Sequence, residues 1–226
     1  SLFCELAISN SLAAGICQFL PSTATNAYQM VVAGSMADHR QSPYVKTELA
    51  GSLELYRSLV KQRNKYKKQT RSHNHFNLQK ALKWLAEGKS GEKQANAQLR
   101  RQTEISGYNK RIREARDNYI TYMEENISLL GNNDIFGKTE FFTGFDERFT
   151  YKKPIFSMVH MLANALRVRN GNVLSAAAAY NAGLRRTWTS EMIYTRYGFI
   201  PNIEETSRYV SRIVANYEEI AKRYYA

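Results

Sequence analysis

Hydrophobic positions spaced three and four residues apart predict helices in the middle of the chain. Leu49, Leu53, Tyr56 and Val60 form one such stripe, which is typical of an amphipathic helix. A second and longer stripe contains Ile105, Tyr108, Ile112, Ala115, Tyr119 and Tyr122, with Leu129 one heptad further. Neither helix could bury its stripe alone, so we expect the two helices to pack as an antiparallel hairpin.

The rest of the chain also predicts helices. Residues 77–87 predict a short helix that ends at Gly88, followed by a loop at 89–91. Pro154 suits the first turn of a helix that runs to about residue 168. Residues 174–182 predict a helix that Gly183 ends, and residues 204–225 predict a long last helix. No segment alternates polar and apolar residues as a strand does, so the predicted fold class is all-α.

Charge distinguishes the middle of the chain from its two ends. The 226 residues have a net charge of +12 and 43% hydrophobic content, which argues against disorder. Residues 46–130 contain 18 Lys and Arg against 9 Asp and Glu, and therefore account for most of the positive charge. No apolar run is long enough to cross a membrane. Cys4 and Cys17 are expected to be buried thiols, and a disulfide between them stays open if the protein is exported.

Three separated segments contain a more specific pattern: AAGICQFLPSTA at 13–24, AAAAYNAG at 176–183 and IPNIEETSRYV at 200–210. Together they resemble the catalytic domain of soluble lytic transglycosylases, lysozyme-like enzymes that cut the glycan strands of peptidoglycan. The residues that match the first family motif are Ser1, Phe3, Ala7, Ser9, Ala13, Gly15, Gln18, Pro21, Thr23 and Ala24.

The resemblance implies a domain organisation. It covers residues 1–30 and 145–226, which would form one discontinuous lysozyme-like, lytic transglycosylase-like domain. The family's Asp-containing turn corresponds to residues 144–149 here. About a hundred residues would then be inserted between the two halves, and residues 46–130 would form an inserted basic helical hairpin.

The resemblance also implies the chemistry. In this family one glutamate protonates the glycosidic oxygen between N-acetylmuramic acid and N-acetylglucosamine, then accepts the proton of the C6 hydroxyl, which leaves a 1,6-anhydro ring. The alignment places that glutamate immediately before Ser1, so we expect the chain to begin one residue after it. Glu5 is the alternative acid, but it would point about 140° away around a helix. We expect no cofactor and no metal.

Six residues are implied as supporting the reaction. The substrate-binding positions are Ser9, Gly15, Gln18, Asn181 and Glu205, and the tyrosine hydroxyl expected to contact the glutamate belongs to Tyr180. A glycine at position 15 would let backbone approach the sugar, and the amide of Gln18 offers both a donor and an acceptor to an N-acetyl group. One extra residue separates Pro201 from Glu205, so Glu204 competes for that role.

Other functions stay open. The leading hypothesis is an exported lytic transglycosylase of the periplasm or cell envelope. A goose-type lysozyme-like hydrolase is a second enzyme, and a non-catalytic peptidoglycan-binding or scaffold protein is the alternative from another class. The hairpin could contact an envelope protein or an anionic envelope polymer. Nucleic acid is not expected, because acids interrupt the basic charge and the aromatic residues lie on the packing stripe.

Overall fold

The structure is a computed structural model that describes residues 6–35, 44–71, 78–129 and 139–225. The chain divides into two compact units, Ser1–Tyr151 and Lys152–Ala226. The described residues form helices and contain no strand, so the all-α prediction is confirmed. The nearest approach to sheet structure is a pair of isolated bridges, Ile8 with Ala14 and Ala14 with Phe19. That residues 1–30 and 145–226 form one domain stays a prediction.

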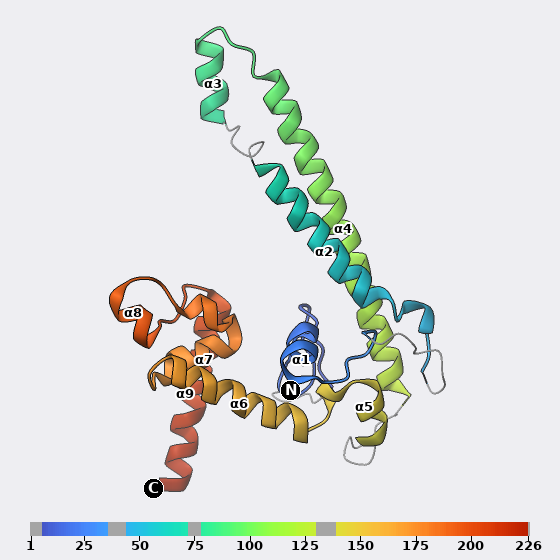
Figure 1. Ribbon diagram of the computed structural model, residues 1–226, viewed down its shortest axis with the longest axis vertical. Coiled ribbons are helices and arrows are strands. Elements are labelled where there is room, and N and C mark those ends of the chain that lie inside the picture. Colours follow the sequence, from blue (N-terminus) through green and yellow to red (C-terminus); the bar gives the residue numbers. More distant parts are fainter. Residues whose placement is uncertain (1–5, 36–43, 72–77, 130–138, 226) are drawn as a thin grey trace. The chain divides into compact units, whose positions relative to one another are not determined.

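Two long helices dominate the first unit. Helix α2, Ser52–Gln69, packs along α4, Glu92–Ser128 (Figure 1). With 37 residues α4 is about 55 Å long. The short helix α3, Leu78–Ala86, lies between them in the chain, as the sequence predicts. Leu49 belongs to a separate 3₁₀ turn, η1 (Thr47–Leu49), because the helix itself begins only at Ser52.

The pair α2–α4 is buried only over part of its length. Leu53 and Leu59 of α2 are buried, and so are Ala115, Tyr119 and Tyr122 of α4. Toward the other end of the pair the contacts become polar: Arg63 donates to Asn109 Oδ1 at 2.9 Å, and Leu99 is 62% exposed. The stripe residues are therefore fully buried at one end of the pair, whereas Ile105 and Tyr108 toward the other end are only partly buried.

Aromatic rings surround the buried end of α4. Helix α5, Thr139–Phe145, and the 3₁₀ turn η4, Glu147–Phe149, follow α4 in the chain. Phe145 of α5 lies 5.8 Å from Tyr122 and 5.2 Å from Tyr44 between ring centroids, and Phe142 lies 5.5 Å from Phe149. These rings bury large apolar areas and join the end of the hairpin to η4.

A buried ion pair lies in the same core. Arg148 and Asp146 are 1% and 0% exposed at the side chain, and Arg148 Nη2 lies 2.8 Å from Asp146 Oδ2. The five N–H donors of a guanidinium all have partners here: both Asp146 oxygens, the Leu12 and Phe19 carbonyl oxygens and the Tyr119 hydroxyl. Tyr119 donates in turn to the Ala33 carbonyl oxygen at 2.9 Å.

The charges in this network stabilise one another. Burial alone would lower the pKa of Arg148, but the Asp146 carboxylate and the Tyr119 hydroxyl outweigh it and hold that pKa above its ordinary value. Burial raises the pKa of Tyr119, and Arg148 opposes only part of that rise. Arg148 therefore stays positively charged, and its hydrogen bonds connect α4, η4 and the segment that contains Leu12 and Phe19.

The second unit is built around a run of small residues. Helix α7, Val173–Ala182, packs against α6, Lys152–Val168, and against α9, Glu204–Tyr225. Ala176 and Ala179 contact Ala165 of α6, whereas Ala177 and Ala178 contact Val210 of α9. The small side chains at residues 176–179 therefore let a neighbouring helix approach closely on both sides of α7.

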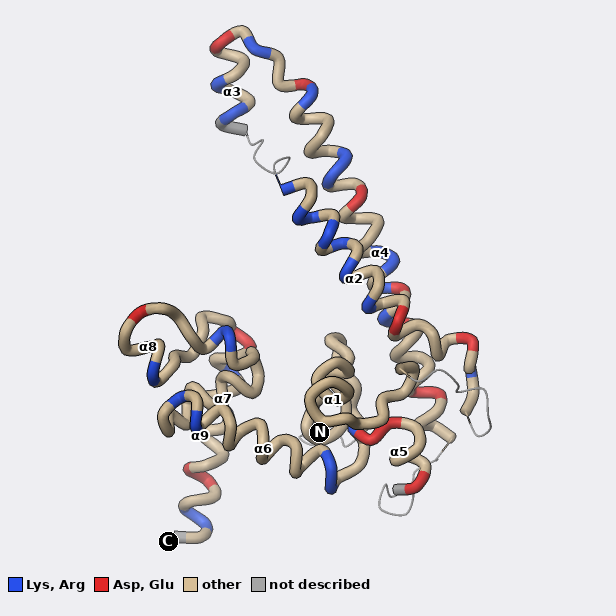
Figure 2. Tube along the Cα trace, viewed as in Figure 1, with Lys and Arg blue, Asp and Glu red and all other residues tan. Residues whose placement is uncertain are grey.

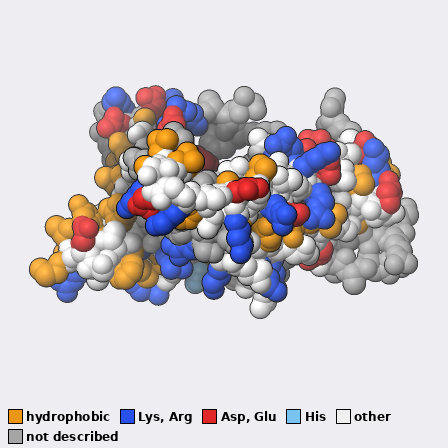
Figure 3. Space-filling view, turned by 90° about the horizontal axis from the view of Figure 1, so that it is seen from above, with side chains coloured by type: hydrophobic (Ala, Val, Ile, Leu, Met, Phe, Trp, Pro, Cys, Tyr) orange, Lys and Arg blue, Asp and Glu red, His pale blue; other side chains and the backbone are white. Residues whose placement is uncertain are grey.

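Two further segments complete the second unit. The 3₁₀ turn η5, Leu184–Thr187, follows α7, and α8 is a short helix, Met192–Tyr197. Arg169 donates to Thr187 Oγ1 at 3.0 Å and to the Leu184 carbonyl oxygen. Helix α8 itself is exposed, with Met192 93% accessible, and hydrophobic side chains gather around it at the left edge of Figure 3. None of the described helices combines the length and apolar character that a membrane crossing needs.

We predict that Asp146→Asn lowers the free energy of unfolding of the first unit by about 3–5 kcal/mol, because it leaves the buried Arg148 cation without its counter-charge. Hydrogen exchange of the peptide at residues 12–19 measures this loss. The control is Glu114→Gln, which removes the exposed ion pair with Lys110 on α4 and should cost at most about 1 kcal/mol. Equal losses in the two variants would contradict the role assigned to the buried pair.

Candidate functional site

The three amino-terminal site residues lie in one tightly closed loop, Ala7–Leu20, just before α1, Pro21–Tyr28. Gly15 N–H donates to the Ala7 carbonyl oxygen at 3.1 Å, and Ala14 N–H donates to that of Phe19 at 3.2 Å. Leu12, Gly15 and Gln18 all have positive φ, at 67°, 73° and 49°. The chain therefore folds back on itself within a few residues, and the described part of the segment before Pro21 is not helical.

Gln18 closes this loop with its side chain. Its Nε2 donates to the Gly15 carbonyl oxygen at 2.8 Å and to the Ala7 carbonyl oxygen at 3.2 Å. The amide nitrogen has two hydrogens, so both are used, while the described residues supply no donor to its Oε1. The side chain is exposed. The sequence predicts a donor and an acceptor at this position, and the geometry leaves the acceptor for a ligand.

Ser9 also participates in the loop. Its Oγ accepts from Ala13 N–H at 3.0 Å and lies 2.9 Å from Ser11 Oγ. Its backbone N–H donates to the Ala13 carbonyl oxygen at 2.8 Å. Contact between Ser9 and a sugar stays a prediction, but the structure assigns this hydroxyl a local role that the sequence did not indicate.

Gly15 is required by packing. A Cβ atom at this position would lie 1.8 Å from the Arg148 carbonyl oxygen and 2.7 Å from its carbonyl carbon. The left-handed φ also favours glycine. The sequence predicts that this glycine lets backbone approach a sugar. That stays a prediction, and the close neighbour observed is the η4 backbone of the protein itself.

The buried Arg148–Asp146 ion pair contacts the same loop through hydrogen bonds to its backbone. Arg148 Nη1 donates to the Leu12 carbonyl oxygen at 2.8 Å and to that of Phe19 at 3.2 Å. These two carbonyls flank the segment that contains Gly15 and Gln18. Sequence reasoning missed Asp146, Arg148 and Tyr119 as supports of the loop. Asp-x-Arg at residues 146–148 is the one available signal, and such charged pairs usually lie in solvent.

Cys17 lies on the inner side of the loop. It is 5% exposed, and burial raises the pKa of its thiol to about 11. The thiolate is therefore disfavoured at neutral pH, which is typical of a cysteine used in packing. The expectation of a buried side chain is confirmed for Cys17, whereas Cys4 and Glu5 lie outside the described residues.

The three carboxy-terminal site residues lie on α7 and α9 of the second unit. Thr206 Oγ1 donates to Asn181 Oδ1 at 2.7 Å, and Thr206 is 1% exposed. The ring of Tyr180 stacks on that of Tyr209, with centroids 6.4 Å apart and an interplanar angle of 14°. The last two motifs of the sequence are therefore neighbours in space, and Asn181 keeps its amide nitrogen for another partner.

The competition between the two glutamates has a structural basis. Glu204 forms an ion pair with Arg208 one turn later on α9. Glu205 is exposed, and within the described ranges it forms no ion pair. Glu205 is therefore the one of these two carboxylates without an ion pair in the described residues, and its contact with a ligand stays a prediction.

In the part of the chain that the structure describes, no group of three His, Cys, Asp or Glu side chains could hold a metal ion. Comparison of the chain with protein-family models, with curated proteins and with solved structures finds no match.

We predict that Gly15→Ala destabilises the first unit by about 3 kcal/mol or more, because a positive φ and a backbone clash add together. Thermal unfolding measures the effect. Gly107→Ala is the matched control, since Gly107 lies in α4 with no atom near its missing Cβ, and an alanine there should stabilise the helix by up to about 1 kcal/mol. A neutral Gly15→Ala would show that η4 does not pack against the loop as described.

Proposed function

We propose that the protein is a peptidoglycan lytic transglycosylase. The observation that supports this most is the Ala7–Leu20 loop, in which both amide hydrogens of the exposed residue Gln18 bond to loop carbonyl oxygens while its Oε1 accepts from no described residue. An amide oxygen left in this way can accept from the N–H of an N-acetyl group, the substituent common to both sugars of the glycan strand.

The pair of helices α7 and α9 supports the same proposal. The Asn181–Thr206 hydrogen bond and the Tyr180–Tyr209 stack involve the two residues, Asn181 and Tyr180, that the resemblance relates to the substrate and to the catalytic acid. Buried alanines position α7 between its two neighbours, which fixes the helix from which Tyr180 and Asn181 project. The relation between this cluster and the Ala7–Leu20 loop is part of the proposal.

The proposed reaction needs one acid, expected at the position before Ser1. Its proton goes to the glycosidic oxygen as the C1–O bond breaks. The C6 hydroxyl of the same muramic acid then attacks C1 and returns a proton to the carboxylate. No water is consumed and no second carboxylate is required, in contrast to most glycosidases.

The acid must begin protonated, which needs an apolar surrounding that raises its pKa. The proposal also requires export of the protein to the cell wall.

Digestion of purified sacculi tests the proposal. The chain is extended by one glutamate before Ser1, and the control has glutamine there. We expect the glutamate form to release muropeptides with 1,6-anhydro ends, identified by mass spectrometry because they lack one water, and the glutamine form to release none. Reducing ends would indicate a hydrolase instead. Binding to sacculi without release in both forms would indicate a glycan-binding protein.

We also predict that Tyr180→Phe in the glutamate form lowers the rate of release about ten- to a hundredfold. Loss of one hydrogen bond to a charged group costs about 1.5–3 kcal/mol, and each 1.4 kcal/mol is a factor of ten in rate. The phenylalanine keeps the ring that stacks on Tyr209. Tyr217→Phe on the exposed part of α9 is the control and should change the rate less than twofold. An unchanged rate for Tyr180→Phe would remove Tyr180 from the reaction.

A further inference from the structure

A second surface lies on the α2–α4 pair, in residues that the proposed function does not use. No Asp or Glu occurs between residues 55 and 86, and Lys and Arg follow one another along the end of α2 (Figure 2). The cations from residue 61 to residue 71 are Lys61, Arg63, Lys65, Lys67, Lys68 and Arg71. Across the described ranges, none of the six forms an ion pair, although other cations of the hairpin do. This charge is therefore not neutralised by the protein.

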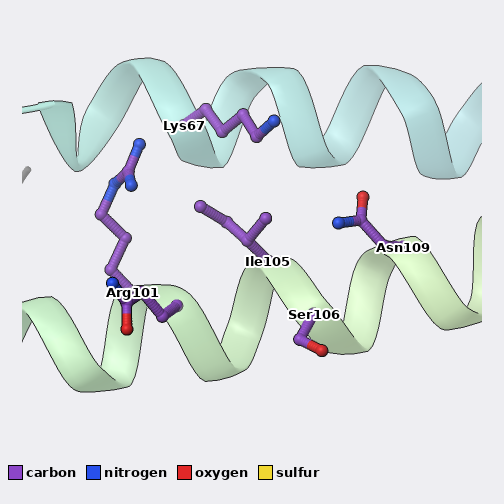
Figure 4. A pocket seen from close by; sticks show the side chains of 6 residues that line it. Lys67, Arg101, Ile105, Ser106 and Asn109 are labelled. Atoms are coloured by element: carbon purple, nitrogen blue, oxygen red, sulfur yellow. The ribbon is translucent and has the colours of Figure 1, made fainter.

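A groove lies between α2 and α4 beside these cations. It has a volume of about 400 Å³ and is lined by Lys67, Arg101, Gln102, Ile105, Ser106 and Asn109. Figure 4 shows Lys67 extending from α2, and Arg101, Ile105 and Asn109 projecting from α4 into the space between the helices. No carboxylate lines the groove. The lining offers two cations, two amides and a hydroxyl around one apolar side chain, which suits an anionic group with several oxygen atoms.

We propose that this groove binds a phosphate group of a linear phosphodiester polymer without bases, such as a polyol phosphate. A polymer is favoured over a single anion because the cations continue beyond the groove. Arg63 and Lys67 are four residues apart and therefore share one face of α2, and Arg63 donates to Asn109, which lines the groove. Arg71 follows four residues after Lys67, just beyond the end of the helix. Arg63 and Lys67 lie about 6 Å apart along the axis, so successive charges of an extended chain can meet successive cations.

The aromatic residues decide against recognition of bases. Single-stranded nucleic acids bind through rings that are free to stack on bases. Here Tyr66 and Tyr108 contact each other across the hairpin, with centroids 6.1 Å apart, and Arg111 covers the Tyr108 ring at 5.0 Å. These rings are used for packing inside the hairpin. The surface therefore recognises charge and spacing, and the inference does not depend on the proposed function.

Fluorescence anisotropy with labelled poly(glycerol phosphate) tests the inference. The groove variant is Lys67→Gln with Arg101→Gln, and the control is Lys83→Gln with Lys110→Gln, which removes two cations that already pair with Glu87 and Glu114. Both variants lower the net charge equally. We expect the groove variant to bind about tenfold more weakly at 0.1 M salt, with a salt slope smaller by about 1.5. The control should stay within about twofold of the unchanged protein.

Two further measurements keep the result decisive. Arg101 also donates to Thr70 Oγ1 at 3.1 Å, so circular dichroism checks the fold, and Lys67→Gln alone should still weaken binding about threefold. Single-stranded DNA with the same number of phosphates and vesicles of anionic lipid are compared with the polymer. Equal losses in groove and control variants, tighter binding of DNA or vesicles, or no binding of the polymer at 0.1 M salt would each overturn the inference.

Discussion

The buried ion pair between Arg148 and Asp146 is the interaction on which the first unit depends. Its five guanidinium donors contact residues from the Ala7–Leu20 loop, η4 and α4, so three segments far apart in the sequence share one charged group. Such a pair contributes little net stability compared with apolar packing of the same volume. What it provides is specificity, because any shift of the loop or of α4 would leave a charge buried without partners. Arg148, which Tyr119 of α4 contacts, therefore holds the loop that contains Gln18 in place.

The same helix α4 serves two different purposes along its length. Near Tyr119 and Tyr122 it is fully buried, and its side chains complete the core of the unit. Near Ile105 its neighbours are polar and cationic, and a groove opens between it and α2. A ligand bound in the groove would thus act on a helix whose other end contacts the ion pair.

Periodicity predicts the helices well where caps and stops are local. Helix α9 has the predicted bounds, and α6 and α7 end near Asn170 and Gly183, because glycine and asparagine adopt positive φ without help from the rest of the fold. Tertiary contacts could not be predicted from periodicity. Charged residues such as Arg148 and Asp146 are usual in solvent-exposed turns, and only the fold shows that these two are buried. Helix α8 is short and exposed and has no apolar period to reveal it. The motif alignment predicts Gln18, Asn181 and Glu205 as site residues, but it could not indicate that both Gln18 amide hydrogens bond within the loop.

The motif residues and the α2–α4 pair differ in the chemistry that they offer to a ligand. At the motif residues the groups left for a ligand include acceptors, the oxygen of Gln18 and the carboxylate of Glu205, which suit the N–H and hydroxyl groups of a neutral sugar. On the hairpin the groups left are donors and cations, which suit phosphate and would not discriminate between sugars. One ligand would rarely need acceptors at the motif residues and, separately, cations on the α2–α4 pair. This difference argues that the basic charge of the α2–α4 pair serves another ligand than the motif residues do.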